Sequence, residues 1–185
     1  MGHAEMEDRK PRQLDGEGLW NYALRALGGR AHSTREMREK LRRRAARMSD
    51  VDEVIERLKD SKYLDDRRFA EGFASARLSN ERFGKTRVLQ DLRGRRIAAG
   101  LAEKTVGEVY RDVDEAALIE EWVRRKYRLA PREGLFEEDK DMASAYRRLL
   151  RAGFRTGEIV RVLKKFARNP ELLDSFEPPE ETSDS

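Results

Sequence analysis

The chain has 185 residues, of which 38% are hydrophobic and 41% are charged. This composition disfavours a single thick core and favours thin helical layers with charged outer faces. The absence of cysteine excludes disulfides and thiolate metal sites, and no stretch is long and apolar enough for a membrane span or a secretion signal, so we expect a cytoplasmic protein without membrane contact.

Helical spacing begins after a polar leader. Residues 1–16 show no periodicity, so we expect them to be disordered. From Gly18 onward, apolar residues recur with helical spacing and never alternate with period two, which predicts helices and no sheet. The first helix should end at the pair Gly28-Gly29, where glycine favours a C-terminal cap.

The next three helices have recognisable starts. Ser33 and Glu36 have the spacing of a capping box, in which each side chain bonds the other's backbone N–H, so the second helix should begin there. Ser49 is the predicted N-cap of the third helix. Asp65 or Asp66 should open the fourth, because carboxylates are favoured at a helix N-terminus.

Five further helices complete the predicted order. The fifth should follow Gly84 and the sixth Gly100, and the seventh should stop by Pro131. The eighth precedes Thr156, which is the predicted cap of the ninth. Residues 169–185 are predicted to be a disordered acidic tail.

Residues 32–41 and 83–92 share a layout. When they are laid over one another, Met37 falls on Val88 and Leu41 on Leu92. A looser third copy runs through the eighth and ninth helices. Such repetition predicts an all-α, elongated array of three tandem three-helix repeats, each a helix-turn-helix-like bundle that buries its apolar face against the next. We place the repeats at residues 17–63, 64–112 and 113–168.

Most aromatic side chains lie at helical spacing among aliphatic residues. This placement favours core packing over stacking on nucleic-acid bases. The aromatic residues predicted to face the core are Trp20, Phe69, Phe73, Trp122, Tyr146 and Phe166. Exposed aromatics are expected instead at Phe83 or Phe136, both in loops.

No constellation of residues predicts catalysis, a cofactor or a metal. Residues 84–86, Gly-Lys-Thr, resemble the end of a P-loop, but Ser79 stands where that motif needs glycine, and a helix is expected in place of the leading strand. Asp65 and Asp66 are interpreted as helix caps, because no further metal ligands have suitable spacing. The two histidines have no nucleophile in a triad arrangement. We therefore expect a protein that is not an enzyme.

Basic residues gather in three clusters, one in each predicted repeat. A charge run is usually a solvated helix face, but these arginines are dense and only weakly countered by nearby acids, which favours a basic track that contacts a polyanion or an acidic protein face. The candidate contact residues are Arg35, Arg38, Arg42, Arg43, Arg44, Arg47, Lys85, Arg87, Arg93, Arg95, Arg96, Arg147, Arg148, Arg151, Lys164 and Lys165.

One segment resembles a known family. Residues 63–70, Tyr-Leu-Asp-Asp-Arg-Arg-Phe-Ala, are similar to the signature of the RecX family, regulators of the RecA recombinase. The pair His32-Ser33 before an arginine-rich helix supports the resemblance upstream, and Gly84-Lys85 followed by residues 88–92 supports it downstream. The chain departs from the family pattern at residues 95–97, which read Arg-Arg-Ile where Lys-Gly-Ile is common.

The resemblance implies a curved, modular all-α protein that lies along a RecA–DNA filament. There it would limit the ATPase, strand-exchange and co-protease activities of RecA. The implied partners are the RecA filament and single- or double-stranded DNA, contacted directly or through the filament, and we expect a monomer. An alternative is a sequence-nonspecific DNA-binding protein that acts without RecA, and a third hypothesis is a generic helical adaptor.

Overall fold

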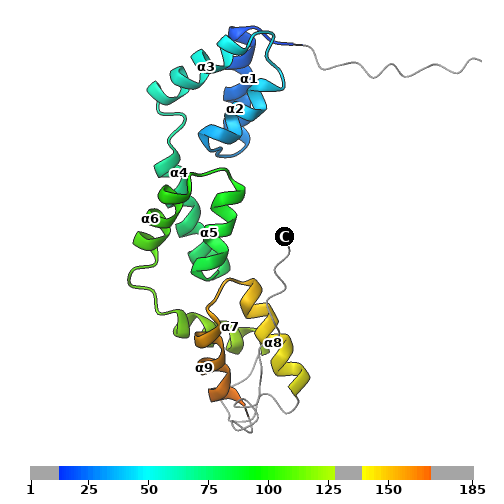
Figure 1. Ribbon diagram of the computed structural model, residues 1–185, viewed down its shortest axis with the longest axis vertical. Coiled ribbons are helices and arrows are strands. Elements are labelled where there is room, and N and C mark those ends of the chain that lie inside the picture. The colour runs from blue at the N-terminus through cyan, green and yellow to red at the C-terminus, as the bar shows by residue number, and fades with distance from the viewer. Residues whose placement is uncertain (1–12, 128–138, 168–185) are drawn as a thin grey trace, which may run out of the picture. The chain divides into compact units, whose positions relative to one another are not determined.

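The computed structural model describes residues 13–127 and 139–167, and within them the chain is helical and has no β-strand. The described part contains nine α-helices and one π-helical turn (Figure 1). In chain order these are α1 (Gly16–Gly29), α2 (Thr34–Arg42), α3 (Met48–Asp60), α4 (Asp66–Ala76), η1 (Arg77–Glu81), α5 (Lys85–Gly94), α6 (Ala99–Val109), α7 (Glu115–Tyr127), α8 (Asp139–Arg151) and α9 (Thr156–Phe166). The predicted all-α class is confirmed.

The folded part starts earlier than predicted. Asp15 is the N-cap of α1, and its side chain accepts a hydrogen bond from the Gly18 N–H. Leu14, one residue before, forms an isolated parallel bridge with Ala45. The last residues of the predicted leader are therefore ordered, because they bond to a turn distant in sequence. Residues 1–12 of the leader and the tail from 168 lie outside the described residues.

Three predicted helix starts have different outcomes. The capping box is confirmed, with the Ser33 hydroxyl and the Glu36 carboxylate each accepting the other's N–H. The predicted caps of the third and ninth helices are wrong. Helix α3 starts one residue before Ser49, and its N-cap, Arg47, has no side-chain bond. Thr156 is the first residue of α9, and its hydroxyl instead accepts a hydrogen bond from the Tyr146 hydroxyl at 3.3 Å.

The chain divides into two compact units. Among the described residues, the first contains residues 13–70 and 94–98. Its core joins the apolar faces of α1, α2 and α3, which pack on one another. The buried members of this core are Leu19, Ala23, Met37, Leu41, Val51, Val54, Ile55, Leu58 and Leu64.

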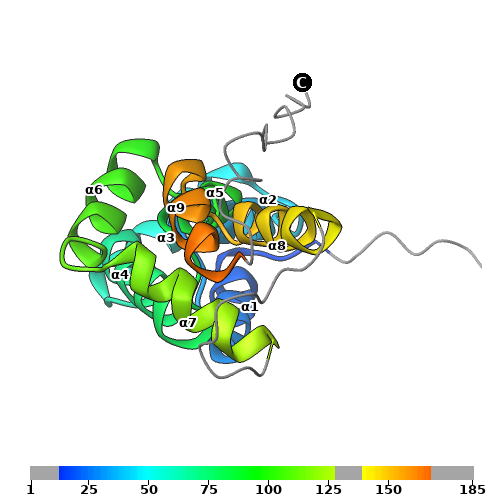
Figure 2. The ribbon, with the colours of Figure 1, turned by 90° about the horizontal axis from the view of Figure 1, so that it is seen from below.

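The second unit contains residues 71–93 and 99–185. In its last three helices, α9 contacts both α7 and α8 (Figure 2). The buried core between these helices includes Ile119, Tyr146 and Leu163. In the earlier helices of the same unit, Val88 of α5 and Val106 of α6 are fully buried. The boundaries between the three predicted repeats stay a prediction.

Most aromatic residues predicted to face the core are less buried than predicted. Tyr146 and Phe166 are buried, as expected. Phe69 and Phe73 of α4 are only half-buried, because the fully buried positions of that helix are Ala70 and Ala74. The predicted core residues Trp20 and Trp122 are also half-buried. Phe83, predicted to be exposed, is half-buried and therefore more buried than predicted, and Phe136 lies outside the described residues.

Candidate nucleic-acid and protein interface

Three arginines at α2 are exposed and make no ion pair with any described residue. These are Arg35, Arg42 and Arg43, which we call the α2 arginine set. Arg35 and Arg42 are two helical turns apart and therefore share a face. Arg42 is the last residue of α2, and Arg43 is its C-cap. An unpaired guanidinium keeps its charge and its five donors available for a phosphate or a carboxylate.

The other candidates near α2 are occupied by intramolecular contacts. Arg38 pairs with Asp52 of α3. Arg47 pairs with the buried Asp50 at 3.0 Å. The Arg44 guanidinium lies 5.7 Å from the centre of the Tyr22 ring. These three side chains already have contacts within the first unit and are therefore less available to a partner.

The second predicted cluster is largely ion-paired. Its pairs are Arg87 with Asp91 at 3.0 Å, Arg93 with Glu103 at 3.2 Å, Arg95 with Glu36 at 3.3 Å and Arg96 with Glu39 at 3.6 Å. Two of these arginines, Arg95 and Arg96, belong to the first compact unit, whereas Arg87 and Arg93 belong to the second. All four arginines are thus paired with carboxylates of their own unit.

A second unpaired set lies on α8. Arg147, Arg148 and Arg151 are exposed and make no ion pair within the described ranges 13–127 and 139–167; we call them the α8 arginine set. Arg151 lies four residues after Arg147, so the two are neighbours on the helix surface. The remaining candidates of this cluster differ, because Lys165 pairs with Glu120 at 2.6 Å and Lys164 is half-buried.

Glu36 connects the arginine-rich helix to two neighbouring segments. Its carboxylate lies 3.2 Å from an Arg30 nitrogen and 3.3 Å from an Arg95 nitrogen. Burial alone would raise the pKa of Glu36, but hydrogen bonds from Arg30 and from the Ser33 N–H outweigh it and hold the pKa below its ordinary value. The carboxylate therefore stays ionised and offsets the positive charge of Arg30 and Arg95.

His32 lies beside the same carboxylate and is almost completely buried. Its Nδ1 is 3.5 Å from a Glu36 oxygen. Burial, together with the charge of Arg30, lowers the pKa of His32 below its ordinary value against the opposing effect of Glu36. The imidazole is thus neutral near pH 7, and we assign it to packing.

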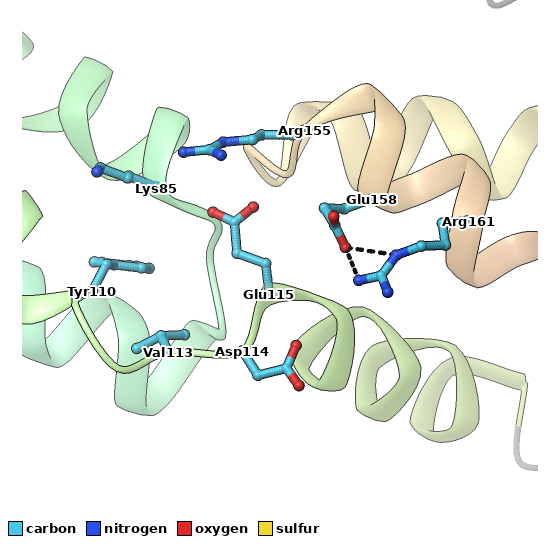
Figure 3. A pocket seen from close by; sticks show the side chains of 8 residues that line it. All are labelled: Lys85, Tyr110, Val113, Asp114, Glu115, Arg155, Glu158 and Arg161. Atoms are coloured by element: carbon cyan, nitrogen blue, oxygen red, sulfur yellow. Dashed lines mark hydrogen bonds and ion pairs between the residues drawn. The ribbon is translucent and has the colours of Figure 1, made fainter.

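A cleft of about 280 Å³ lies in the second unit. It is lined by Lys85, Tyr110, Val113, Asp114, Glu115, Arg155, Glu158 and Arg161. Figure 3 shows the Glu115 side chain extending toward that of Arg155, while Arg161 bonds Glu158. The lining contains three cationic side chains and three carboxylates, so its charges cancel and favour neither an anionic nor a cationic ligand. Burial raises the pKa of Tyr110, whose hydroxyl donates to the Phe83 carbonyl at 2.7 Å.

The segment that resembles a P-loop end has its backbone donors in use. The Gly84 N–H donates to the Ala152 carbonyl at 2.8 Å, and the Thr86 N–H donates to the Gly153 carbonyl at 3.2 Å. A loop that binds phosphate needs such N–H groups free to point at the ligand. Here they bind another part of the chain.

Neither a metal site nor a membrane span is found in the part of the chain that the structure describes. No three His, Asp or Glu side chains there are grouped closely enough to hold a metal ion. None of the described helices is long and apolar enough to cross a membrane.

Comparisons with known proteins place the chain in a family. Two family models match it, the first three-helix domain of RecX at residues 20–58 and the second at residues 65–106. The regulatory protein RecX of Deinococcus radiodurans is 36% identical over 163 residues, covering 83% of this chain and 71% of the relative. The chain belongs to the RecX family.

Other RecX proteins extend the match. The regulatory protein RecX of Salmonella arizonae is 30% identical, and the match covers 88% of this chain and 99% of that protein. The crystal structure of RecX from Lactobacillus salivarius shares the fold with a TM-score of 0.65 at 19% identity, covering 88% of this chain and 98% of that one. The predicted RecX resemblance is confirmed.

Sequence reasoning missed the contacts that link segments distant in the chain. The Ser33 hydroxyl, which also serves the capping box, donates to the Arg95 carbonyl at 2.6 Å. Asp66 accepts from the Thr34 N–H at 2.7 Å. The overlay of residues 32–41 on 83–92 was the available signal, because it places Ser33 and Gly84 at equivalent positions before their helices.

Proposed function

We propose that this chain regulates RecA, mainly as a negative modulator that binds RecA–DNA filaments and limits their ATPase, strand-exchange and co-protease activities. Membership of a family whose curated members are named regulatory protein RecX supports the proposal. The chain would thus act in DNA recombination and repair, as a cytoplasmic monomer without catalysis or a cofactor of its own.

The observation that supports the proposed contact surface is the presence of the α2 and α8 arginine sets. Both are exposed and lack ion pairs with described residues, whereas most other candidate arginines are neutralised within the chain. Binding through unpaired charges avoids the cost of breaking an existing pair. We therefore propose these six arginines as the principal contacts, and the paired ones as secondary.

The proposed mechanism relies on several modest contacts made at once. The α2 set belongs to the first compact unit and the α8 set to the second, so two separate parts of one chain can engage a repetitive filament. Linked contacts of this kind raise overall affinity without one dominant site. A preference for one filament state would then shift RecA away from the active arrangement by the difference in affinity between the two states.

The test is the single-stranded-DNA-dependent ATPase rate of RecA from the same organism with this protein titrated in. Inhibition is expected, and the double variant Arg42→Glu/Arg43→Glu should require several-fold more protein. The matched control is Arg25→Glu/Arg68→Glu, which makes the same change in net charge at two exposed arginines outside the proposed surface. Absence of inhibition by the native chain at equimolar RecA would contradict the proposal.

The unpaired arginines also favour a second candidate function, nonspecific DNA binding without RecA. Arginine binds phosphate bidentately, and such binding weakens steeply as salt rises. Tight binding of the native chain to bare duplex DNA, together with no effect on RecA, would favour this candidate over filament regulation.

A further inference from the structure

The turn that follows the second helix of a repeat accepts a hydrogen bond through a backbone carbonyl at two places. In the first unit, the Ser33 hydroxyl donates to the Arg95 carbonyl at 2.6 Å. In the second unit, the Gly84 N–H donates to the Ala152 carbonyl at 2.8 Å. In each case the donor stands just before the second helix of one repeat, and the acceptor lies in the turn after the second helix of the next.

The two acceptor turns share their backbone form. The residue after each acceptor has a positive φ, 63° at Arg96 and 88° at Gly153. The next residue in each turn is apolar and buried, Ile97 in one and Phe154 in the other. The two contacts are therefore copies of one joint between successive repeats.

The equivalent turn of the first repeat, after α2, is also bonded, and its partner is the segment that precedes α1. In the overlay of residues 32–41 on 83–92, Arg44 takes the place of Arg95. The Arg44 carbonyl accepts from the Leu14 N–H at 2.6 Å, and the Ala46 N–H donates to the Leu14 carbonyl at 2.9 Å. The segment before α1 thus occupies the position that a preceding repeat would fill.

This segment is anchored on a second side. The Asp15 side chain accepts from the Gly18 N–H at 2.9 Å, and the Asp15 carbonyl accepts from the Leu19 N–H at 2.8 Å. The Leu14 side chain is half-buried against the core of α1, α2 and α3. The segment is consequently fixed both to the start of α1 and to the turn after α2.

We infer that Leu14 and Asp15 form a cap on the first repeat, which bonds the turn after α2 as a neighbouring repeat bonds the other two turns, and which fixes the turn that carries Arg42 and Arg43. In helical arrays each repeat contacts its neighbours, and a face not covered by another repeat needs a cap. Arg42 and Arg43 directly precede the bonded Arg44 carbonyl, so the cap sets where these unpaired arginines point. This role in positioning rests on the proposed function, whereas the cap itself does not.

The cap is tested by amide hydrogen exchange of the full chain. The substitution Leu14→Pro removes the N–H that donates to Arg44, and we expect exchange at the Ala46 amide to accelerate about tenfold or more. Gln13→Pro is the matched control, since it places the same residue one position earlier, at an exposed side chain. The Gly84 amide, in the equivalent joint of the second unit, should be unchanged in both variants. Equal exchange at Ala46 in the native chain and in Leu14→Pro would overturn the cap.

The positioning role is tested by affinity for RecA filaments on single-stranded DNA. Leu14→Pro should weaken binding several-fold, although every arginine is retained, and Gln13→Pro should not. Leu27→Ala controls for general loss of stability, because Leu27 is another half-buried side chain packed on the same core. Native affinity in Leu14→Pro would remove the positioning role. If the native chain does not bind filaments, the proposed function fails, and the exchange result still decides the cap.

Discussion

The Asp66 carboxylate accepts a hydrogen bond from the backbone N–H of Thr34 at 2.7 Å, which joins the start of α4 to the start of α2. Its neighbour Asp65 bonds locally, to the Arg68 N–H of its own helix at 3.0 Å. Two adjacent carboxylates in the family signature thus have different tasks. One caps its own helix, and the other satisfies a free N–H at a helix 32 residues away in the chain.

Replacing Asp66 with Ala should destabilise the protein more than replacing Asp65 with Ala. Loss of Asp66 leaves the Thr34 N–H without its charged acceptor, at a cost of about 1.5–3 kcal/mol. Loss of Asp65 removes one N-cap, at about 1 kcal/mol. Urea unfolding of both variants measures the difference. Asp66→Asn, which keeps an oxygen acceptor, should recover part of the loss, and equal costs at the two positions would contradict the assignment.

Gly84 lies too close to the backbone of Gly153 to carry a side chain. A Cβ on Gly84 would lie 2.3 Å from the Gly153 carbonyl oxygen, which belongs to the backbone of the turn between α8 and α9 and can move only with that turn. Gly84→Ala should therefore cost about 1–3 kcal/mol through overpacking. Gly72→Ala in α4 is the control, because a Cβ there meets no atom within 4 Å. That variant should gain up to about 1 kcal/mol from helix propensity. Thermal unfolding that ranks the two variants in the opposite order would show that the joint is not rigid.

The helices were predictable because their signals are local. Apolar spacing and the box of Ser33 with Glu36 require only neighbouring residues, and both are confirmed. The predicted cap at Ser49 was wrong, because a serine in the first turn of a helix gives the same local sequence pattern as a serine at the N-cap. Phe69 was assigned to the core for its apolar character, whereas the helix buries the neighbouring face that carries Ala70.

The interface was only partly predictable, because neutralisation of an arginine depends on distant carboxylates. Arg95 lies 59 residues from Glu36, the residue with which it pairs, and Lys165 lies 45 residues from Glu120. A count of acids within one helix cannot find these pairs. The dense runs correctly indicated where arginine is abundant, and only tertiary contacts separate the exposed, unpaired residues from those that hold the fold together.

Lowering the pH should destabilise the protein through His32 before it does so through Glu36. The His32 pKa is lowered in the folded state, from an ordinary 6.5, by burial and by Arg30 and Lys40, with Glu36 opposing. The unfolded chain therefore binds the proton more readily, and the free energy of unfolding falls as the pH drops through and below 6.5 toward the folded pKa. The lowered pKa of Glu36 gives a loss in the same direction at lower pH, as its carboxylate protonates below its ordinary 4.5.

Urea unfolding between about pH 7.5 and 5.5 isolates the histidine, because carboxylates titrate mostly below this range. His32→Phe is the informative variant, since Phe83 takes the equivalent place in the overlay of residues 32–41 on 83–92. Its free energy of unfolding should vary less with pH in this interval than that of the native chain. The same slope in both proteins would assign the pH dependence to other groups.

The salt dependence of DNA binding should show whether the α2 arginines contact phosphate. If Arg42 and Arg43 each neutralise one phosphate of duplex DNA, the variant Arg42→Ala/Arg43→Ala should reduce the slope of log K against log salt by about 1.8, at ~0.9 for each contact. Arg25→Ala/Arg68→Ala should leave the slope unchanged, although it removes as many charges. If the α2 variant loses affinity for RecA filaments but keeps the native slope on bare DNA, these arginines bind the protein part of the filament. In that case the partners are oxygen acceptors of RecA, and a carboxylate would suit these arginines best because a planar guanidinium can donate two parallel hydrogen bonds to it.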